Sequence, residues 1–248
     1  MQKLNKIYRT NYGGERITTE ASLLGSQWQY KTEWVPSAVA NNHISKIACI
    51  IGNGSSRNNF PTDLLTNHLA GRLGAKSVQT YGCNALCRDF SPTFMVTVGN
   101  EITDEIVKSG YCDKHIVYAN SDKILAYPGK FYLIPQDFIS NAGTIATYLA
   151  CFDGHEKIYL LSFDNQAGDY YNNNVYAGTN GYADANQNYS DDFWILSMTQ
   201  IMSMYNEVEF VRVCPTPNYK CPDTWRQLSN FRQISFNEFA IEVDLGVT

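Results

Sequence analysis

The sequence lacks the features that mark membrane, secreted or nucleic-acid-binding proteins. No apolar run approaches the roughly 20 residues that cross a bilayer, and the opening stretch, MQKLNKIYRTNYGGE, contains no apolar signal segment. Acidic residues outnumber basic ones by 24 to 19, giving a net charge of −5, whereas non-specific nucleic-acid binding needs a basic face. We therefore expect a cytoplasmic protein with no membrane span and no nucleic-acid partner.

Metal ligands in a recognisable pattern are also scarce. Cys83 and Cys87, with three residues between them, are a weak metal hint, but a zinc site needs two more ligands and none of the 4 His shows metal-type spacing. The 7 Cys are odd in number, irregularly spaced and partly inside apolar runs, which favours reduced core thiols. We expect no metal site, and we expect His155, between a helix and a strand, at the surface.

Several catalytic signatures are missing as well. The chain has no nucleophile elbow of serine hydrolases and no Asp-x-Asp signature of metal-dependent glycosyltransferases. A short apolar run ends in GNGSS at residues 52–56, which resembles the start of many nucleotide-binding sheets. This loop lacks the lysine of an ATP-binding P-loop and the third glycine of a dinucleotide fingerprint.

The chain nevertheless has the material for a sizeable α/β domain, with 248 residues of which 44% are hydrophobic. Residues 1–45, rich in Thr, Tyr and Trp, predict an extended arm or small β-hairpin that covers a domain edge, mediates oligomerisation or docks to a larger assembly. Residues 46–218 predict one nucleotide-binding domain, and residues 219–248 a C-terminal packing segment in which ISFNEFAIEVDL forms a strand or an arm.

Strand-like and helix-like segments alternate through the central domain. This alternation predicts a Rossmann-like, three-layer α/β fold with a mostly parallel sheet covered on both faces. A polar loop at 165–188 is too long for a simple connector. The expected strands are 46–52, 77–82, 93–99, 114–120, 131–135, 156–164 and 208–215, and the expected helices are 60–74, 84–90, 101–110, 140–154 and 190–205.

Short polar residues follow several of these strands. Because ligands of parallel sheets bind outside the carboxyl ends of the strands, we expect these residues to form one small-molecule pocket. Glycine lets the backbone approach a ligand, and asparagine both donates and accepts hydrogen bonds, which suits a heterocycle or ribose. Each residue taken alone is also a common turn former. The candidates are Gly52, Asn53, Gly54, Ser55, Ser56, Asn84, Asn100, Ser162 and Asp164.

In order, IIGNGSS, YGCNAL, FMVTVGNE and SNAGTIATYLACFDGHEKIYLLSFD resemble the bacterial sialyltransferases of glycosyltransferase family 42. They also resemble the wider group of motility-accessory-factor and pterin-pyrophosphokinase-like proteins. The resemblance covers about residues 46–218, and the arm motif YRTNYGGE is similar to uncharacterised proteins of tailed phages.

The resemblance implies a cytidine-type nucleotide-sugar donor as substrate, with no tightly bound cofactor and a glycan or other hydroxyl compound as acceptor. By position it assigns donor binding to Asn53, Gly54, Ser55, Ser56, Asn84, Asn100 and Asp164, and to the helix start near Ala142, Gly143 and Thr144. Tyr170 or Tyr171 stands for one of the tyrosines that hold the leaving phosphate. The family's catalytic base is a histidine in the loop before the long helix, and residues 172–193 contain no histidine. Asp184, Asp191 or Asp192 would have to replace it as the base.

Three functions remain open at this point. The first is an inverting, metal-independent glycosyltransferase in which the polar loop closes over the site. The second is a non-enzymatic phage virion or accessory protein that retains the fold and assembles through its arm, in the host cytoplasm or the virion. The third is a pyrophosphokinase, for which Glu101 and Asp164 are the candidate Mg²⁺ ligands near the loop.

Overall fold

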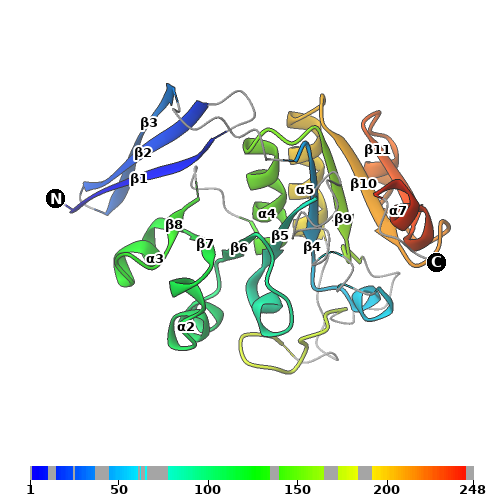
Figure 1. Cartoon of the computed structure of the whole chain (residues 1–248), viewed down its shortest axis with the longest axis horizontal. Helices are drawn as coiled ribbons and strands as arrows, with labels where there is room; N and C mark the ends of the chain where they lie inside the picture. The colour runs from blue at the N-terminus through cyan, green and yellow to red at the C-terminus, as the bar shows by residue number, and fades with distance from the viewer. Residues whose placement is uncertain are drawn as a thin grey trace.

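In a computed structural model the chain forms two β-sheets, one small and one large (Figure 1). The small sheet is antiparallel, in the order β1-β2-β3, so the predicted arm is a three-stranded sheet and not a single hairpin. Its strands are Gln2–Thr10, Glu15–Leu24 and Gln27–Pro36. The structure describes residues 2–10, 15–24, 26–36, 45–60, 62, 65, 78–134, 140–164, 173–183 and 192–243.

The large sheet has eight strands, all parallel, in the order β11-β10-β9-β4-β5-β6-β7-β8. Helices cover its faces, which confirms the predicted Rossmann-like α/β fold. From β4 the chain runs outward to β8 and then returns beside β4 as β9, so the strand order reverses between β4 and β9. The strands are Ile47–Ile51, Gln79–Cys83, Phe94–Thr97, Ile116–Ala119, Tyr132–Leu133, Lys157–Leu161, Glu209–Cys214 and Phe231–Ser235.

The helices follow local sequence signals. The helix α4 begins after Asn141, whose side chain accepts a hydrogen bond from the Thr144 amide at 2.9 Å and so caps the first turn. Almost every residue of α4 is buried, because it crosses from β8 to β9 against the sheet and α5. The α-helices are α2 at Asn100–Lys108, α3 at Ser121–Ala126, α4 at Ala142–Phe152, α5 at Asp192–Met204, α6 at Asp223–Arg226 and α7 at Phe236–Glu242, and the 3₁₀ helices are η1 at Ser55–Asn59, η2 at Asn84–Arg88 and η3 at Tyr111–Asp113.

The C-terminal region departs from the expected strand or arm. Its first part, β11, pairs in parallel with β10, so the large sheet continues past residue 218. The next part is the helix α7, which begins with a capping box: the Ser235 hydroxyl accepts from the Glu238 amide at 3.2 Å, and the Glu238 carboxylate accepts from the Ser235 amide at 2.7 Å. The Ser-x-x-Glu spacing that signals this helix start is visible in the sequence.

The core contains polar side chains that hydrophobic patterning does not reveal. His155, expected at the surface, is buried: its Nε2 lies 2.9 Å from the Tyr81 hydroxyl, which donates to Asp153 at 2.5 Å. The 7 cysteines are all free, as expected for reduced thiols, and five are fully buried. No helix within the described ranges has the length and apolar character needed to cross a membrane.

Candidate functional site

A cavity of about 290 Å³ lies at the carboxyl edge of the large sheet, where the strand order reverses between β4 and β9. Such reversal points are where open parallel sheets bind ligands, because the connections diverge to opposite faces and leave a crevice. Four parts of the chain form its walls: the ends of β4, β5 and β9, the start of α4, residues 173–183, and Trp194 of α5. It is lined by Gly52, Asn53, Gly54, Cys83, Asn84, Asn141, Ala142, Gly143, Ser162, Phe163, Asp164, Asn173, Asn174, Gly181, Tyr182, Ala183 and Trp194.

The two glycines of the GNGSS loop allow close approach to the neighbouring strand. The Gly52 amide donates to the Leu161 carbonyl at 2.8 Å, and the Gly54 amide donates to the Ser162 carbonyl at 3.0 Å. A Cβ atom on Gly52 would lie 2.6 Å from the Ser162 carbonyl oxygen, and one on Gly54 would lie 2.5 Å from an Asp164 carboxylate oxygen. Packing against the end of β9 therefore requires glycine at both positions, whether or not a ligand is bound.

The loop's hydrogen-bond donors are largely used inside the protein. The Asp164 carboxylate accepts from the Ser56 amide and from the Ser56 hydroxyl, both at 2.7 Å. Asn173 Oδ1 accepts from the Ser55 amide at 3.2 Å and from the Ser55 hydroxyl. A side-chain carboxylate thus caps the start of η1, where a phosphate would sit in a phosphate-binding loop. Ser56 and Asp164, both predicted ligand contacts, are partners of each other, although Asp164 also lines the cavity.

The start of α4 contributes two backbone amides for which the described residues provide no hydrogen-bond acceptor. The amides of Ala142 and Gly143 belong to the first turn, which leaves them without intrahelical partners. Ser162, at the end of β9, is 2% exposed, and its hydroxyl makes no hydrogen bond within the described part of the chain. Ser162 also has φ of 60°, an unfavourable conformation for a residue other than glycine. Thr144 Oγ1, one turn into α4, is likewise buried without a partner among the described residues.

A buried arginine that the sequence analysis missed supports the β9 side of the cavity. Arg212, in β10, is 0% exposed, and its guanidinium donates twice to the Phe163 carbonyl, at 2.8 and 3.1 Å, and once to the Lys220 carbonyl at 2.7 Å. It thereby fixes the backbone between Ser162 and Asp164. A charged residue in the middle of the apolar run VEFVRVC was the signal available in the sequence.

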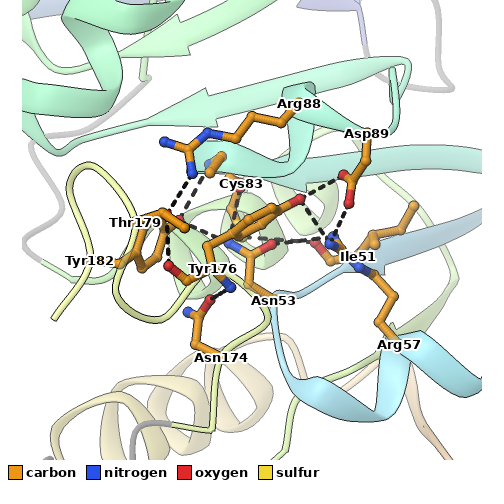
Figure 2. Close-up of polar contacts among 11 residues, drawn as sticks. Ile51, Asn53, Arg57, Cys83, Arg88, Asp89, Asn174, Tyr176, Thr179 and Tyr182 are labelled. Atoms are coloured by element: carbon orange, nitrogen blue, oxygen red, sulfur yellow. Dashed lines mark hydrogen bonds and ion pairs between the residues drawn. The ribbon is translucent and has the colours of Figure 1, made fainter. Parts of the chain in front are cut away.

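Residues 173–183, which we call the wall segment, form one side of the cavity, and Figure 2 shows the contact of Tyr182 with Asn53. The Val175 amide donates to the Asn53 carbonyl at 2.8 Å, and the Tyr182 hydroxyl accepts from Asn53 Nδ2 at 3.1 Å and from the Ala85 amide at 3.3 Å. Burial raises the pKa of Tyr182, so its hydroxyl stays neutral. This segment supplies five of the cavity-lining residues, none of which was among the predicted site residues.

An ion pair between Arg88 and Glu105 contacts the wall segment. Arg88 donates to both oxygens of the Glu105 carboxylate at 2.7 Å and to Thr179 Oγ1 at 2.7 Å, and Asn180 Nδ2 donates to Glu105 at 3.0 Å. The hydrogen bonds from Arg88, followed by the one from Asn180, hold the pKa of Glu105 below its usual range.

Because the folded-state pKa of Glu105 is lowered, this contact stabilises fully above the usual carboxyl pKa of about 4.3 and is lost as the pH falls through the lowered value. We expect hydrogen exchange in residues 173–183, corrected for intrinsic rates, to accelerate in this acid range before exchange in β4 and β5. Glu105→Gln should remove the pH dependence. Equal acceleration in both proteins would show that another group controls it.

The remaining predicted residues have different placements. Asn84 lines the cavity with φ of 50°, and its Oδ1 accepts from the Val98 amide at 3.4 Å. Asn100 is exposed at the start of α2, does not line this cavity and accepts a hydrogen bond from Lys123. Gly143 lines the cavity, but Thr144 does not. Tyr171, Asp184 and Asp191 lie outside the described residues, and Asp192 is exposed in the first turn of α5.

The chemistry of the lining is that of a polar, mostly neutral binding site. Five asparagines, one serine and one tyrosine provide donors and acceptors, Phe163 and Trp194 provide aromatic surface, and Asp164 is the single charged side chain within the described lining. Burial raises the pKa of Cys83 to about 12, so its thiol stays protonated and is not an activated nucleophile. No group of three or more His, Cys, Asp or Glu in the described residues is arranged to hold a metal ion.

Comparison with known proteins adds no assignment to this geometry. No family model matches the chain, and no curated protein or solved structure matches it.

Proposed function

We propose that the cavity binds the nucleotide part of a nucleotide sugar, and that the protein is an inverting, metal-independent glycosyltransferase of the sialyltransferase-like kind. The observation that carries the proposal is the unused donor set on one wall. Ala142, Gly143 and Ser162 all line the cavity at the sheet's reversal point, and the described residues provide no partner for the two helix-start amides or for the Ser162 hydroxyl. Amides at a helix start and an unpaired hydroxyl suit one anionic oxygen group.

The lining favours a nucleoside monophosphate over a diphosphate. The start of α4 and Ser162 offer a single group of donors without partners among the described residues, whereas the Ser55 and Ser56 amides of the GNGSS loop donate to Asn173 and Asp164. The amides of Asn53, Asn84 and Asn174 suit the edges of a base or ribose, and Phe163 and Trp194 offer it aromatic surface. The cavity volume of about 290 Å³ lies at the lower end of the range for small-molecule sites. A CMP-type donor fits these properties best.

In the proposed transfer, the acceptor hydroxyl oxygen forms a bond to the anomeric carbon of the sugar. The bond from that carbon to the phosphate oxygen breaks, and its electron pair stays on the phosphate. The amides of α4 and the Ser162 hydroxyl stabilise the released charge. The hydroxyl proton passes to a base, for which Asp184 and Asp191 are the sequence-based candidates.

The decisive test measures the binding of CMP, UDP and GDP by two methods, thermal unfolding and calorimetry. CMP should raise the melting temperature, because a ligand that binds the folded state stabilises it by mass action. Ser162→Ala should weaken CMP binding by about tenfold or more, the usual effect of losing a hydrogen bond to a charged group. The same change should leave stability equal or slightly higher, because the removed hydroxyl is buried and unpartnered. The absence of saturable binding of all three nucleotides would contradict the proposal.

A second candidate is a non-enzymatic protein that keeps the fold, such as a virion or accessory component. It is favoured by the internal use of predicted binding groups, since Ser56 pairs with Asp164 and Asn53 with Tyr182. Transfer assays with CMP-sugars and hydroxyl acceptors separate the two candidates. Detection of the protein in purified particles, together with no nucleotide binding, would support the second.

A further inference from the structure

Tyr176 is held by charged groups from two separate strand ends. Its hydroxyl donates to Asp89 Oδ1 at 2.6 Å and accepts from Arg57 Nη2 at 2.8 Å, and Arg57 Nη2 also lies 2.9 Å from Asp89 Oδ2. The Arg57 and Arg88 guanidinium carbons lie over the Tyr176 ring, at 5.1 and 5.4 Å from its centroid. We call these four residues the latch (Figure 2).

The latch residues do not line the cavity. Arg57, Arg88, Asp89 and Tyr176 are absent from the described lining, whereas Asn173, Asn174, Gly181, Tyr182 and Ala183, on either side of Tyr176 in sequence, belong to it. Arg57 is in η1 after β4, and Arg88 ends η2 after β5. The latch therefore attaches the wall segment to the rigid sheet through groups that a ligand in the cavity does not touch.

The wall segment is held by buried rings and by polar contacts that are partly exposed. The Asp89 side chain is 54% exposed, and residues 178–181 and 183 are exposed. Outside the latch, Val175 and Tyr182 pack partly against the core, the Val175 amide donates to the Asn53 carbonyl, and the Tyr182 hydroxyl accepts from Asn53 Nδ2 and the Ala85 amide. Segments held in this way open locally at a low free-energy cost without unfolding the core.

We propose that Tyr176 is a positioning residue and that release of its latch opens the wall segment for ligand to enter and leave the cavity. The inference rests on the proposed function only in treating the cavity as a ligand site. It assigns no chemical step to the latch. Tyr176 acts by holding Tyr182, Asn173 and Asn174 in place. Its loss should therefore change the rates at which ligand enters and leaves the cavity, while the groups that bind the ligand remain the same.

The first test uses hydrogen exchange on the full, ligand-free chain. Tyr176→Phe keeps the ring but removes both hydroxyl contacts. Exchange of the peptide containing Val175 and Tyr182 should accelerate by about ten- to a hundredfold, as expected for losing hydrogen bonds to charged groups. The matched control is Tyr127→Phe, which removes a tyrosine–carboxylate contact with Asp104 elsewhere in the fold and should leave this peptide unchanged. Unchanged exchange in Tyr176→Phe would overturn the proposal.

A second variant guards against a general folding defect. Asp89→Asn alters a partly exposed member of the latch, so the fold should persist, and it should accelerate exchange in the same peptide while β4 and β5 stay protected. If both latch variants accelerate exchange throughout the sheet to the same extent, Tyr176 contributes to global stability only, and the proposal is wrong.

A third experiment measures ligand dissociation, with CMP as the ligand. Dissociation of CMP, measured by stopped-flow fluorescence, should be faster in Tyr176→Phe than in the wild type, and Tyr127→Phe should match the wild type. Equal dissociation rates in all three would overturn the gating role. If wild-type protein does not bind CMP, the proposed function fails, while the exchange experiment still decides whether the latch holds the wall segment.

Discussion

Gly52→Ala is expected to lower the free energy of unfolding by about 3 kcal/mol, the upper part of the usual range for overpacking a tight site. The new methyl group would lie 2.6 Å from the Ser162 carbonyl oxygen and 3.1 Å from the Ser162 carbonyl carbon. Both are backbone atoms that Arg212 helps to hold through the next residue, so neither can rotate away as a side chain would. Relief requires β4 and β9 to separate at their ends, which would also widen the cavity. Chemical denaturation monitored by circular dichroism measures the loss.

The matched control for this change is Gly99→Ala. Gly99 precedes α2 with φ of −75°, and no atom lies within 4 Å of the position its Cβ would take. Its replacement should cost less than about 1 kcal/mol, the usual effect of exchanging glycine for alanine at a helix N-cap. If Gly52→Ala proves as mild as Gly99→Ala, the close contact between the loop and β9 does not limit this position.

Arg212→Met is expected to cost about 2–4 kcal/mol of stability, because an acceptor left without its donor in a buried site costs about 1–3 kcal/mol. Methionine fills similar space but leaves the buried carbonyl of Phe163 and the part-buried carbonyl of Lys220 without their donor. Because Phe163 lies between Ser162 and Asp164, the variant that remains folded should also bind CMP more weakly. Equilibrium unfolding and calorimetry measure the two effects.

The comparison variant for Arg212→Met is Arg226→Met. The Arg226 side chain is 59% exposed and lies 3.9 Å from Asp223, so its loss should change stability by less than about 1 kcal/mol. A similar small effect for Arg212→Met would mean that water or a neighbouring donor satisfies the carbonyls, and that Arg212 does not support the β9 wall.

Much of the fold could be predicted because its signals are local. Apolar runs of strand length, separated by helical segments, indicated a parallel sheet. β4, β5, β6, β7 and β10 lie within one or two residues of the expected strands, and β9 ends three residues earlier than expected. The tail was harder because α7 is short and follows β11 directly, with only the Ser235–Glu238 capping box to mark the change. The surface placement of His155 was wrong, because its burial depends on Tyr81 and Asp153, which are contributed by different elements.

The sequence by itself determined the alternation of strands and helices and the presence of Gly, Asn and Ser where the strands end. Periodicity and turn chemistry are properties of neighbouring residues, so they can be read from the chain. Only the tertiary structure decided how those residues are used. Pairing of β4 with β9 places the glycines against a backbone and directs Ser56 to Asp164. It also leaves the Ser162 hydroxyl buried without a partner among the described residues, and it brings Tyr176 between Arg57 and Asp89. Hydrogen-bond partners more than 100 residues apart, as Ser56 and Asp164 are, follow from strand order and register, which local pattern does not specify.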